Sequence, residues 1–190
     1  MENLSVTIEA KVLKALLLFA GKKDIRTYIN TVHFERAANA TYAIATNGHV
    51  VAVAKLDGMS DLPAASFTVP REYLEAAALA KYSLLLDQAG PNVKITSIKG
   101  NMTVPLLDAK FPDWRRVTAA QQTGERAYFH PDYAALVNKA GQIIAPLSNA
   151  YLIQQNGGSV GYCKISNDFH AYVMPLRSGL EGAVVSSPTW

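Results

Sequence analysis

Cysteine is almost absent from this chain of 190 residues, and long apolar runs are absent altogether. The single cysteine, Cys163, has no second cysteine with which to form an internal disulfide or a zinc site. No apolar run approaches the ~18 residues needed to span a bilayer, and the start Met1-Glu2-Asn3 lacks the basic residues of a secretory signal. We therefore expect a cytoplasmic protein without a membrane partner.

The motifs of common catalytic sites are missing as well. The four histidines lie in unrelated contexts, without the His-x-x-x-His or Cys-His spacing of a metal site. The chain contains no Gly-x-x-x-x-Gly-Lys loop for a phosphate and no Gly-x-Ser-x-Gly elbow for a nucleophilic serine. Scattered aspartates give little support to a hydrolase or nuclease. The sequence predicts a protein that is not an enzyme and needs no metal and no cofactor.

A short alternating strand followed by an amphipathic helix occurs three times in the chain. Taking Ile8, Val69 and Phe129 as equivalent positions, the intervals are 61 and 60 residues. A fixed interval indicates one supersecondary unit copied along the chain. Each copy is predicted to run strand, helix and three strands, with turns at Asn47-Gly48, Pro91 and Gly100-Asn101.

The predicted elements follow from the apolar periodicity of each copy. We expect Asn47-Gly48 to form a type I′ hairpin turn, in which both residues have positive φ. The predicted helices cover residues 11–20, 70–81 and a stretch from Pro131, and the predicted strands cover residues 6–8, 28–34, 41–45, 50–54, 66–69, 83–87, 93–98, 102–107, 128–129, 151–155, 160–165 and 170–175.

Three segments are more specific than the repeat. They are Ala-Thr-Asn-Gly-His at 45–49, Phe-Pro-Asp-Trp-Arg-Arg-Val at 111–117 and Tyr-Val-Met-Pro-Leu-Arg at 172–177. In this order they resemble the bacterial replicative sliding clamp, the beta subunit of DNA polymerase III, which carries Ala-Thr-Asp-Gly-His-Arg-Leu, Phe-Pro-Asp-Tyr-Arg-Arg-Val and Val-Met-Pro-Met-Arg. The segments at 26–30 and 69–71 are also similar to the clamp. Val50 and Val51 depart from it, because they replace Arg-Leu and remove a cation.

The resemblance implies an α+β DNA-clamp fold, in which repeated strand-helix-three-strand units place helices on one face of antiparallel sheets. Residues 1–117 resemble the clamp's middle domain and residues 125–178 the second half of its last domain, with a linker at 118–124 and a C-terminal tail at 179–190. The clamp ring holds twelve such units, so three per chain predict a homo-oligomer, with a tetramer favoured and a dimer possible. We expect the third unit to lack a partner within its own chain, exposing a sheet edge and an apolar helix face.

The implied function is that of a processivity factor, which tethers a polymerase or other replication protein to duplex DNA without sequence specificity. A non-encircling module that captures clamp-binding peptides as an adaptor or decoy is the alternative. A third possibility is that the tail at 179–190 fills the peptide groove and inhibits it.

The resemblance also implies two sets of site residues. A net charge of +3 is compatible with DNA, although lysines on ordinary solvated helix faces would look the same. The DNA-facing set is Lys11, Lys14, Lys22, Lys23, Arg71, Lys81 and Lys139. The peptide-binding set is Ile29, Thr46, Gly48, His49, Pro112, Val117, His130, Tyr133, Met174, Pro175 and Leu176.

Overall fold

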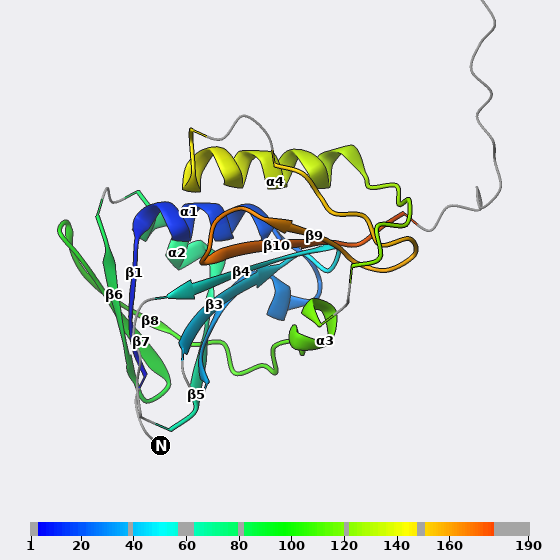
Figure 1. The fold of residues 1–190 in the computed structure, drawn as a ribbon. Helices are drawn as coiled ribbons and strands as arrows, with labels where there is room; N and C mark the ends of the chain where they lie inside the picture. Colours follow the sequence, from blue (N-terminus) through cyan, green and yellow to red (C-terminus); the bar gives the residue numbers. More distant parts are fainter. Residues whose placement is uncertain are drawn as a thin grey trace, which may run out of the picture.

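The computed structural model describes residues 4–37, 40–56, 63–79, 82–119, 122–147 and 151–176. These residues form two antiparallel sheets with a layer of helices (Figure 1). The elements in chain order are β1 (Ser5–Ile8), α1 (Ala10–Phe19), the 3-10 helix η1 (Thr27–Ile29), β2 (Thr31–Ala37), β3 (Ala40–Thr46), β4 (Val50–Leu56), β5 (Ala65–Pro70), α2 (Arg71–Ala77), β6 (Leu84–Ala89), β7 (Asn92–Ser97), β8 (Gly100–Pro105), α3 (Arg115–Thr118), α4 (Pro131–Ile144), β9 (Gly161–Lys164) and β10 (Phe169–Val173).

The first two repeats exchange their opening strands. The opening strand of repeat one, β1, pairs with β6 of repeat two, and β5 of repeat two pairs with β2 of repeat one. The strand orders are β1-β6-β7-β8 in one sheet and β5-β2-β3-β4-β10-β9 in the other. In both exchanged pairs buried residues lie opposite each other, Ile8 with Leu84 and Val69 with Val32. This exchange ties residues between 29 and 82 positions apart into one unit. The alternation of apolar residues along each strand fixes the register of the pairing.

The helices α1, α2 and α4 lie on the same side of the six-stranded sheet, and α3 lies on the opposite side (Figure 1). Leu13, Leu16 and Phe19 are fully buried and project from α1 into the core that the sheet forms below it. Helix α4 packs along α1, and its Val137 and Ala140 are also fully buried. The apolar side chains of α1 and α4 recur with the 3.6-residue period of a helix, which places them on the covered faces.

The third repeat has partners within the chain, contrary to our expectation. Strand β10 pairs with β4 over Phe169↔Ala54 to Val173↔Val50, so that the third repeat extends the sheet of the first. Its helix α4 covers α1 instead of exposing an apolar face. The predicted lack of a partner and the predicted exposed helix face were wrong, because they considered only the partner that a repeat has inside a two-repeat domain, and the sheet continues beyond that boundary.

Several local predictions need correction. Residues 27–29 form a 3-10 turn, and the predicted strand at 28–34 begins only at Thr31. Helix α2 ends at Ala77, short of the predicted residue 81. In the third repeat, residues 128–129 were predicted as a strand but lie outside any sheet. The strand predicted at 151–155 is reduced to a single β-bridge between Gln154 and Tyr162. The domain boundaries remain a prediction, and the tail at 179–190 lies outside the described residues.

Truncating Phe169 tests whether the third repeat shares one core with the first. Its ring is 2% exposed and lies 6.3 Å from the Phe19 ring on α1. We expect Phe169→Ala to lower the free energy of unfolding by about 3–5 kcal/mol, the usual cost of a large cavity, in urea denaturation followed by circular dichroism. Ile98→Ala, at a side chain that is 68% exposed, is the control and should change it by less than about 0.5 kcal/mol. An equally small effect of Phe169→Ala would contradict the shared core.

Candidate peptide-binding pocket and nucleic-acid face

A second, smaller apolar cluster lies on the face of the six-stranded sheet that the helices leave open. Ile44 and Val53 point to this face because their neighbours along β3 and β4 point to the helices. The chain after β8 crosses the cluster, and the Phe111 ring stacks on His33 at 4.6 Å with the planes 6° apart. The crossing segment covers part of the sheet and forms one wall of a pocket.

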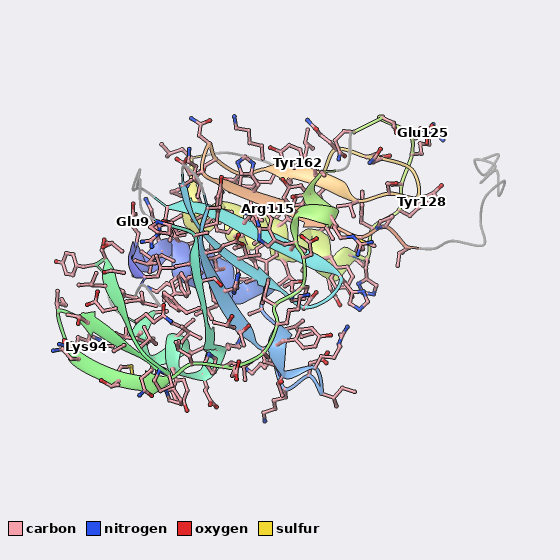
Figure 2. All side chains as sticks on the ribbon, turned by 90° about the horizontal axis from the view of Figure 1, so that it is seen from below. Glu9, Lys94, Arg115, Glu125, Tyr128 and Tyr162 are labelled. Atoms are coloured by element: carbon pink, nitrogen blue, oxygen red, sulfur yellow. The ribbon has the colours of Figure 1, made fainter. Side chains whose placement is uncertain are left out.

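Glu35 on β2 anchors the crossing segment. Its carboxylate accepts a hydrogen bond from Trp114 Nε1 at 3.1 Å and pairs with Arg115 Nη1 at 2.8 Å. The Arg115 guanidinium also lies 4.3 Å from the centre of the Trp114 ring, a cation–π contact. Arg115 is seen over the sheet in Figure 2. The three contacts fix Trp114 against the sheet, where its large ring helps to enclose the pocket.

The pocket has a volume of about 170 Å³ and lies at the junction of repeat one, the crossing segment and the end of the third repeat. Ile29 and Thr46 are buried at its base, whereas Pro112, His49 and Met174 are exposed at its rim. Its lining is mainly apolar and aromatic, with few polar groups, which suits an extended apolar peptide. The lining residues are Arg26, Tyr28, Ile29, Thr46, Gly48, His49, Val51, Phe111, Pro112, Asp113, Trp114, Val117, Tyr172 and Met174.

The loop between β3 and β4 shapes one side of the pocket. The predicted type I′ turn is wrong, because Gly48 has a φ of 90° while Asn47 does not have a positive φ. The Asn47 Oδ1 instead accepts hydrogen bonds from the backbone N–H groups of His49 and Val50. Thr46 Oγ1 donates to the carbonyl of Val50 and accepts from the N–H of Gly48. The side-chain oxygen that Asn and Asp share therefore explains why either residue suits this position.

Arg26 supplies a cation at the rim. A Cβ atom on Gly48 would lie only 3.0 Å from Arg26 Nη1, so glycine permits the guanidinium to rest against the loop. Arg26 donates to both carboxylate oxygens of Asp24, at 3.0 and 2.9 Å. These hydrogen bonds lower the pKa of Asp24 to about 2, so the pair stays ionised over the physiological range. The pocket thus has a cation in its lining, although Val50 and Val51 supply none.

The third repeat contributes to the rim through backbone and ring contacts. The N–H of Met174 donates to the His49 carbonyl at 2.8 Å, which brings the end of β10 to the loop after β3. The Tyr133 ring on α4 stacks on the His49 ring, with 5.4 Å between the ring centres. The centre of the His130 ring lies 5.3 Å from that of the same tyrosine. Pro175 and Leu176 follow Met174 but do not line the cavity.

The structure thus gathers most of the predicted peptide-binding residues around one cavity and adds residues that sequence reasoning missed. Val51 and Tyr172 reach the pocket because the pairing of β4 with β10 sets Val51 opposite Tyr172. Phe111, Asp113 and Trp114 lie inside the recognised segment, so its pattern could have indicated them. The pairing of β4 with β10 left no local signal in the sequence.

The predicted DNA-facing residues lie in mixed surroundings. Lys14 is exposed on α1 and Lys139 on α4. Lys11 is also exposed, and its Nζ forms an ion pair with Glu9 Oε2 at 3.0 Å. Lys22 and Lys23 are exposed in the loop after α1, where Lys23 has a φ of 57°. Lys81 lies outside the described residues.

Arg71, which the resemblance places in the DNA-facing set, is held by two contacts within the chain. Its Nε pairs with Glu75 at 2.7 Å, and its Nη1 donates to the Ala20 carbonyl at 2.6 Å, which ties α2 to the end of α1. Glu72 and Glu75 are exposed on the same short helix. The helix layer therefore carries both signs of charge, with its exposed cations on α1, on the following loop and on α4.

Among the described residues, no group of three or more His, Cys, Asp or Glu side chains is arranged to hold a metal ion. In the same part of the chain, no helix is both long enough and apolar enough to cross a membrane.

Two antiparallel sheets of exchanged repeats, with helices on one face and an apolar pocket between repeats, define a DNA-clamp fold. Solved structures of the DNA polymerase III beta subunit share it. The protein from Pseudomonas aeruginosa gives a TM-score of 0.64 at 18% identity, over 92% of this chain and 67% of that one. The protein from Borrelia burgdorferi gives a TM-score of 0.67 at 13% identity, over 93% and 65%. The predicted α+β clamp fold is confirmed.

Curated sequences support the same resemblance. The beta sliding clamp of Proteus mirabilis is 32% identical over 111 residues, which are 53% of this chain and 29% of the relative. That of Escherichia coli K12 is 27% identical over 116 residues, covering 56% of this chain and 30% of the relative. No protein-family model matches the chain. The chain is therefore similar to part of the bacterial sliding clamp, and the match spans less than a third of those relatives.

The largely buried side chain of His33, which is 12% exposed, makes the free energy of unfolding depend on pH. Burial lowers its pKa from 6.5 to about 4, so the unfolded chain binds a proton at a higher pH than the folded chain. Stability should therefore fall as the pH drops from about 6.5 to 4, by up to about 1.4 kcal/mol per pH unit from this residue. His33→Asn keeps a polar atom near Thr68 Oγ1 and should make the free energy of unfolding less dependent on pH between about 6.5 and 4. Urea unfolding at several pH values measures this dependence. The same dependence in both proteins would contradict a contribution from His33.

Proposed function

We propose that this protein is a non-enzymatic clamp-like processivity factor, which holds a polymerase or another replication protein at duplex DNA. Partner proteins bind through short linear peptides in the pocket beside the loop after β3. The chain self-associates into a ring, with a tetramer favoured and a dimer possible. The observation that carries the proposal is the pocket itself, because it unites three segments that are far apart in the chain.

The chemistry of the pocket supports peptide binding. Ile29, Val51 and Val117 offer aliphatic surface, and Met174 offers a flexible side chain that adapts to apolar partners. The carbonyl of His49 is already bonded to Met174, so the loop and the end of β10 keep a fixed relation before a peptide arrives. Such preorganisation lowers the entropic cost of binding.

The helix layer supports weak, sliding contact with DNA. Lys14, Lys22 and Lys139 are exposed on one layer of helices and their loop, where ammonium groups can meet phosphates without reading bases. Few such contacts keep the interaction mobile, and a closed ring then supplies retention by topology.

A second candidate function is a clamp-like module that never encircles DNA and captures clamp-binding peptides as an adaptor or decoy. The charge of the helix layer favours it, because Glu72 and Glu75 accompany the lysines and Arg71 is held by Glu75. In this case the pocket acts alone and the helix layer has no nucleic-acid partner.

Met174→Ala tests the pocket with a matched control elsewhere. We expect it to weaken binding of a fluorescein-labelled clamp-binding peptide about tenfold, which corresponds to about 1.4 kcal/mol, in a fluorescence anisotropy titration. Met102→Ala is the control, because Met102 on β8 is 37% exposed and Met174 is 41% exposed. Equal affinities of the two variants would place the peptide elsewhere.

Retention on DNA separates the two candidate functions. A ring should stay on a nicked circular plasmid and leave after the plasmid is linearised, whereas a non-encircling module should be retained on neither. Lys14→Glu combined with Lys139→Glu should reduce retention and its salt dependence, because two phosphate contacts are lost. Lys94→Glu, on an exposed side chain of β7 far from α4, should leave both unchanged (Figure 2). Gel filtration of the protein–plasmid mixture measures how much protein elutes with the DNA.

A further inference from the structure

We propose that two copies of this chain join by exchanging the opening strands of their third repeats, so that residues 126–129 of each copy pair with residues 151–155 of the other. This pairing forms the interface through which the chain self-associates, and the self-association itself rests on the proposed function. The partner at the interface is a second copy of the same chain.

The first two repeats provide the pattern for this exchange. Strand β5 leaves its own repeat and pairs with β2, while β1 makes the reciprocal pairing with β6. The third repeat has the same opening segment and the same accepting position, residues 151–155, which precede β9 as β2 precedes β3. No third reciprocal pairing exists among the described residues.

The opening segment of the third repeat is already placed for the exchange. In repeat two, Leu107 N–H, after the last strand, donates to the carbonyl of Thr68 at 2.9 Å. In repeat three, Leu176 N–H donates to the carbonyl of Tyr128 at 2.7 Å. Thr68 and Tyr128 occupy the same position in their repeats, each one residue before the reference positions Val69 and Phe129. The segment at 126–129 therefore leaves its repeat in the same way as β5 but joins no strand among the described residues; its Ala127 N–H donates only to the side-chain Oε1 of Gln155, at 3.0 Å.

The accepting edge is occupied by its own chain at one end and free at its middle: the Gln155 carbonyl accepts from Gly124 N–H at 3.0 Å, whereas Ile153 has no such partner in the described part of the chain. The backbone of Gln154 bonds to Tyr162, so the alternating pattern turns the groups of Ile153 to the opposite side. Among the described residues, the N–H and C=O of Ile153 have no hydrogen-bond partner. The edge at 151–155 also carries no charged residue, although natural edge strands are commonly protected by charge. An unprotected edge of this kind indicates that a strand covers it.

Side-chain directions fit the same pairing. A Cβ atom on Gly161 would lie 2.5 Å from the Phe129 ring and 2.8 Å from Ile153, so both side chains point to the core of the repeat. Tyr128 and Leu152 point outward and are 53% and 81% exposed. An antiparallel pairing that sets Tyr128 opposite Leu152 of the second copy keeps inward residues opposite inward residues, as in β1–β6 and β5–β2. It also covers two large apolar side chains.

The labelled view agrees with an interface at one end of the molecule. Tyr128 and Glu125 lie at the outer margin in Figure 2, and Lys94 lies at the opposite end. A second copy can therefore approach this end without meeting the four-stranded sheet.

Disulfide trapping between two single variants tests the exchange directly. Tyr128→Cys and Leu152→Cys are prepared separately and oxidised alone and as a mixture, so that a bond between the two introduced cysteines can form only in the mixture and only between two chains. We expect a species of twice the chain mass on a non-reducing gel, which a reductant reverses. Tyr128→Cys mixed with Ile98→Cys is the matched control and should stay at single-chain mass, and the native Cys163 is 1% exposed and should not react.

A second variant keeps the proposal falsifiable without trapping. Leu152→Asp alters an exposed side chain, so the chain should fold, but the charge should weaken self-association at least about tenfold in sedimentation equilibrium. Ile98→Asp should leave it unchanged. A protein that is dimeric or larger but neither forms the 128–152 bond nor responds to Leu152→Asp would overturn the exchange and leave the ring standing. A trapped dimer that is not retained on circular DNA would overturn the ring and leave the exchange standing.

Discussion

The pairing of β4 with β10 is the contact on which the rest of this molecule depends. It joins residues 50–54 to residues 169–173 and so fuses the first and third repeats into one six-stranded sheet. One face of that sheet carries Ala52, Ala54 and Ala171, whose small side chains let α1 and α4 lie close against the strands and against each other. Without this pairing the third repeat would have no core, since its own strands are short and its opening segment joins no sheet.

The same pairing creates the pocket on the other face. Strand alternation turns Val51 and Tyr172 outward beside each other, and the Met174–His49 hydrogen bond closes the end of the seam. The crossing segment then completes the enclosure, held by Glu35. Burial of His33 under Phe111 lowers the pKa of this histidine and keeps it neutral, so no charge is trapped beneath the segment. Core and pocket are two consequences of one strand register.

The pocket and the helix layer differ in how strongly the structure prepares them for a partner. The pocket is preformed by side-chain and backbone hydrogen bonds around Thr46, Asn47 and Glu35. The helix layer has a few exposed lysines, an ion pair at Lys11 and an engaged Arg71. The proposed peptide capture therefore depends on chemistry fixed within one chain, whereas the proposed retention on DNA depends on how several chains assemble.

The sequence by itself indicated the repeat and its amphipathic helices, because alternation and helical periodicity are local properties of the chain. Its resemblance to the sliding clamp, and not its periodicity, implied that Ile29, Thr46, Pro112 and Met174 belong to one site, and the structure brings these four residues to one cavity. Only the tertiary structure decided which strands pair across repeats. It also decided that the opening segment of the third repeat joins no strand among the described residues, and that Arg71 binds Ala20 and Glu75. The physical reason is that pairing between distant strands is selected by the competition of all available edges for backbone hydrogen bonds, and no local pattern in the sequence records that competition.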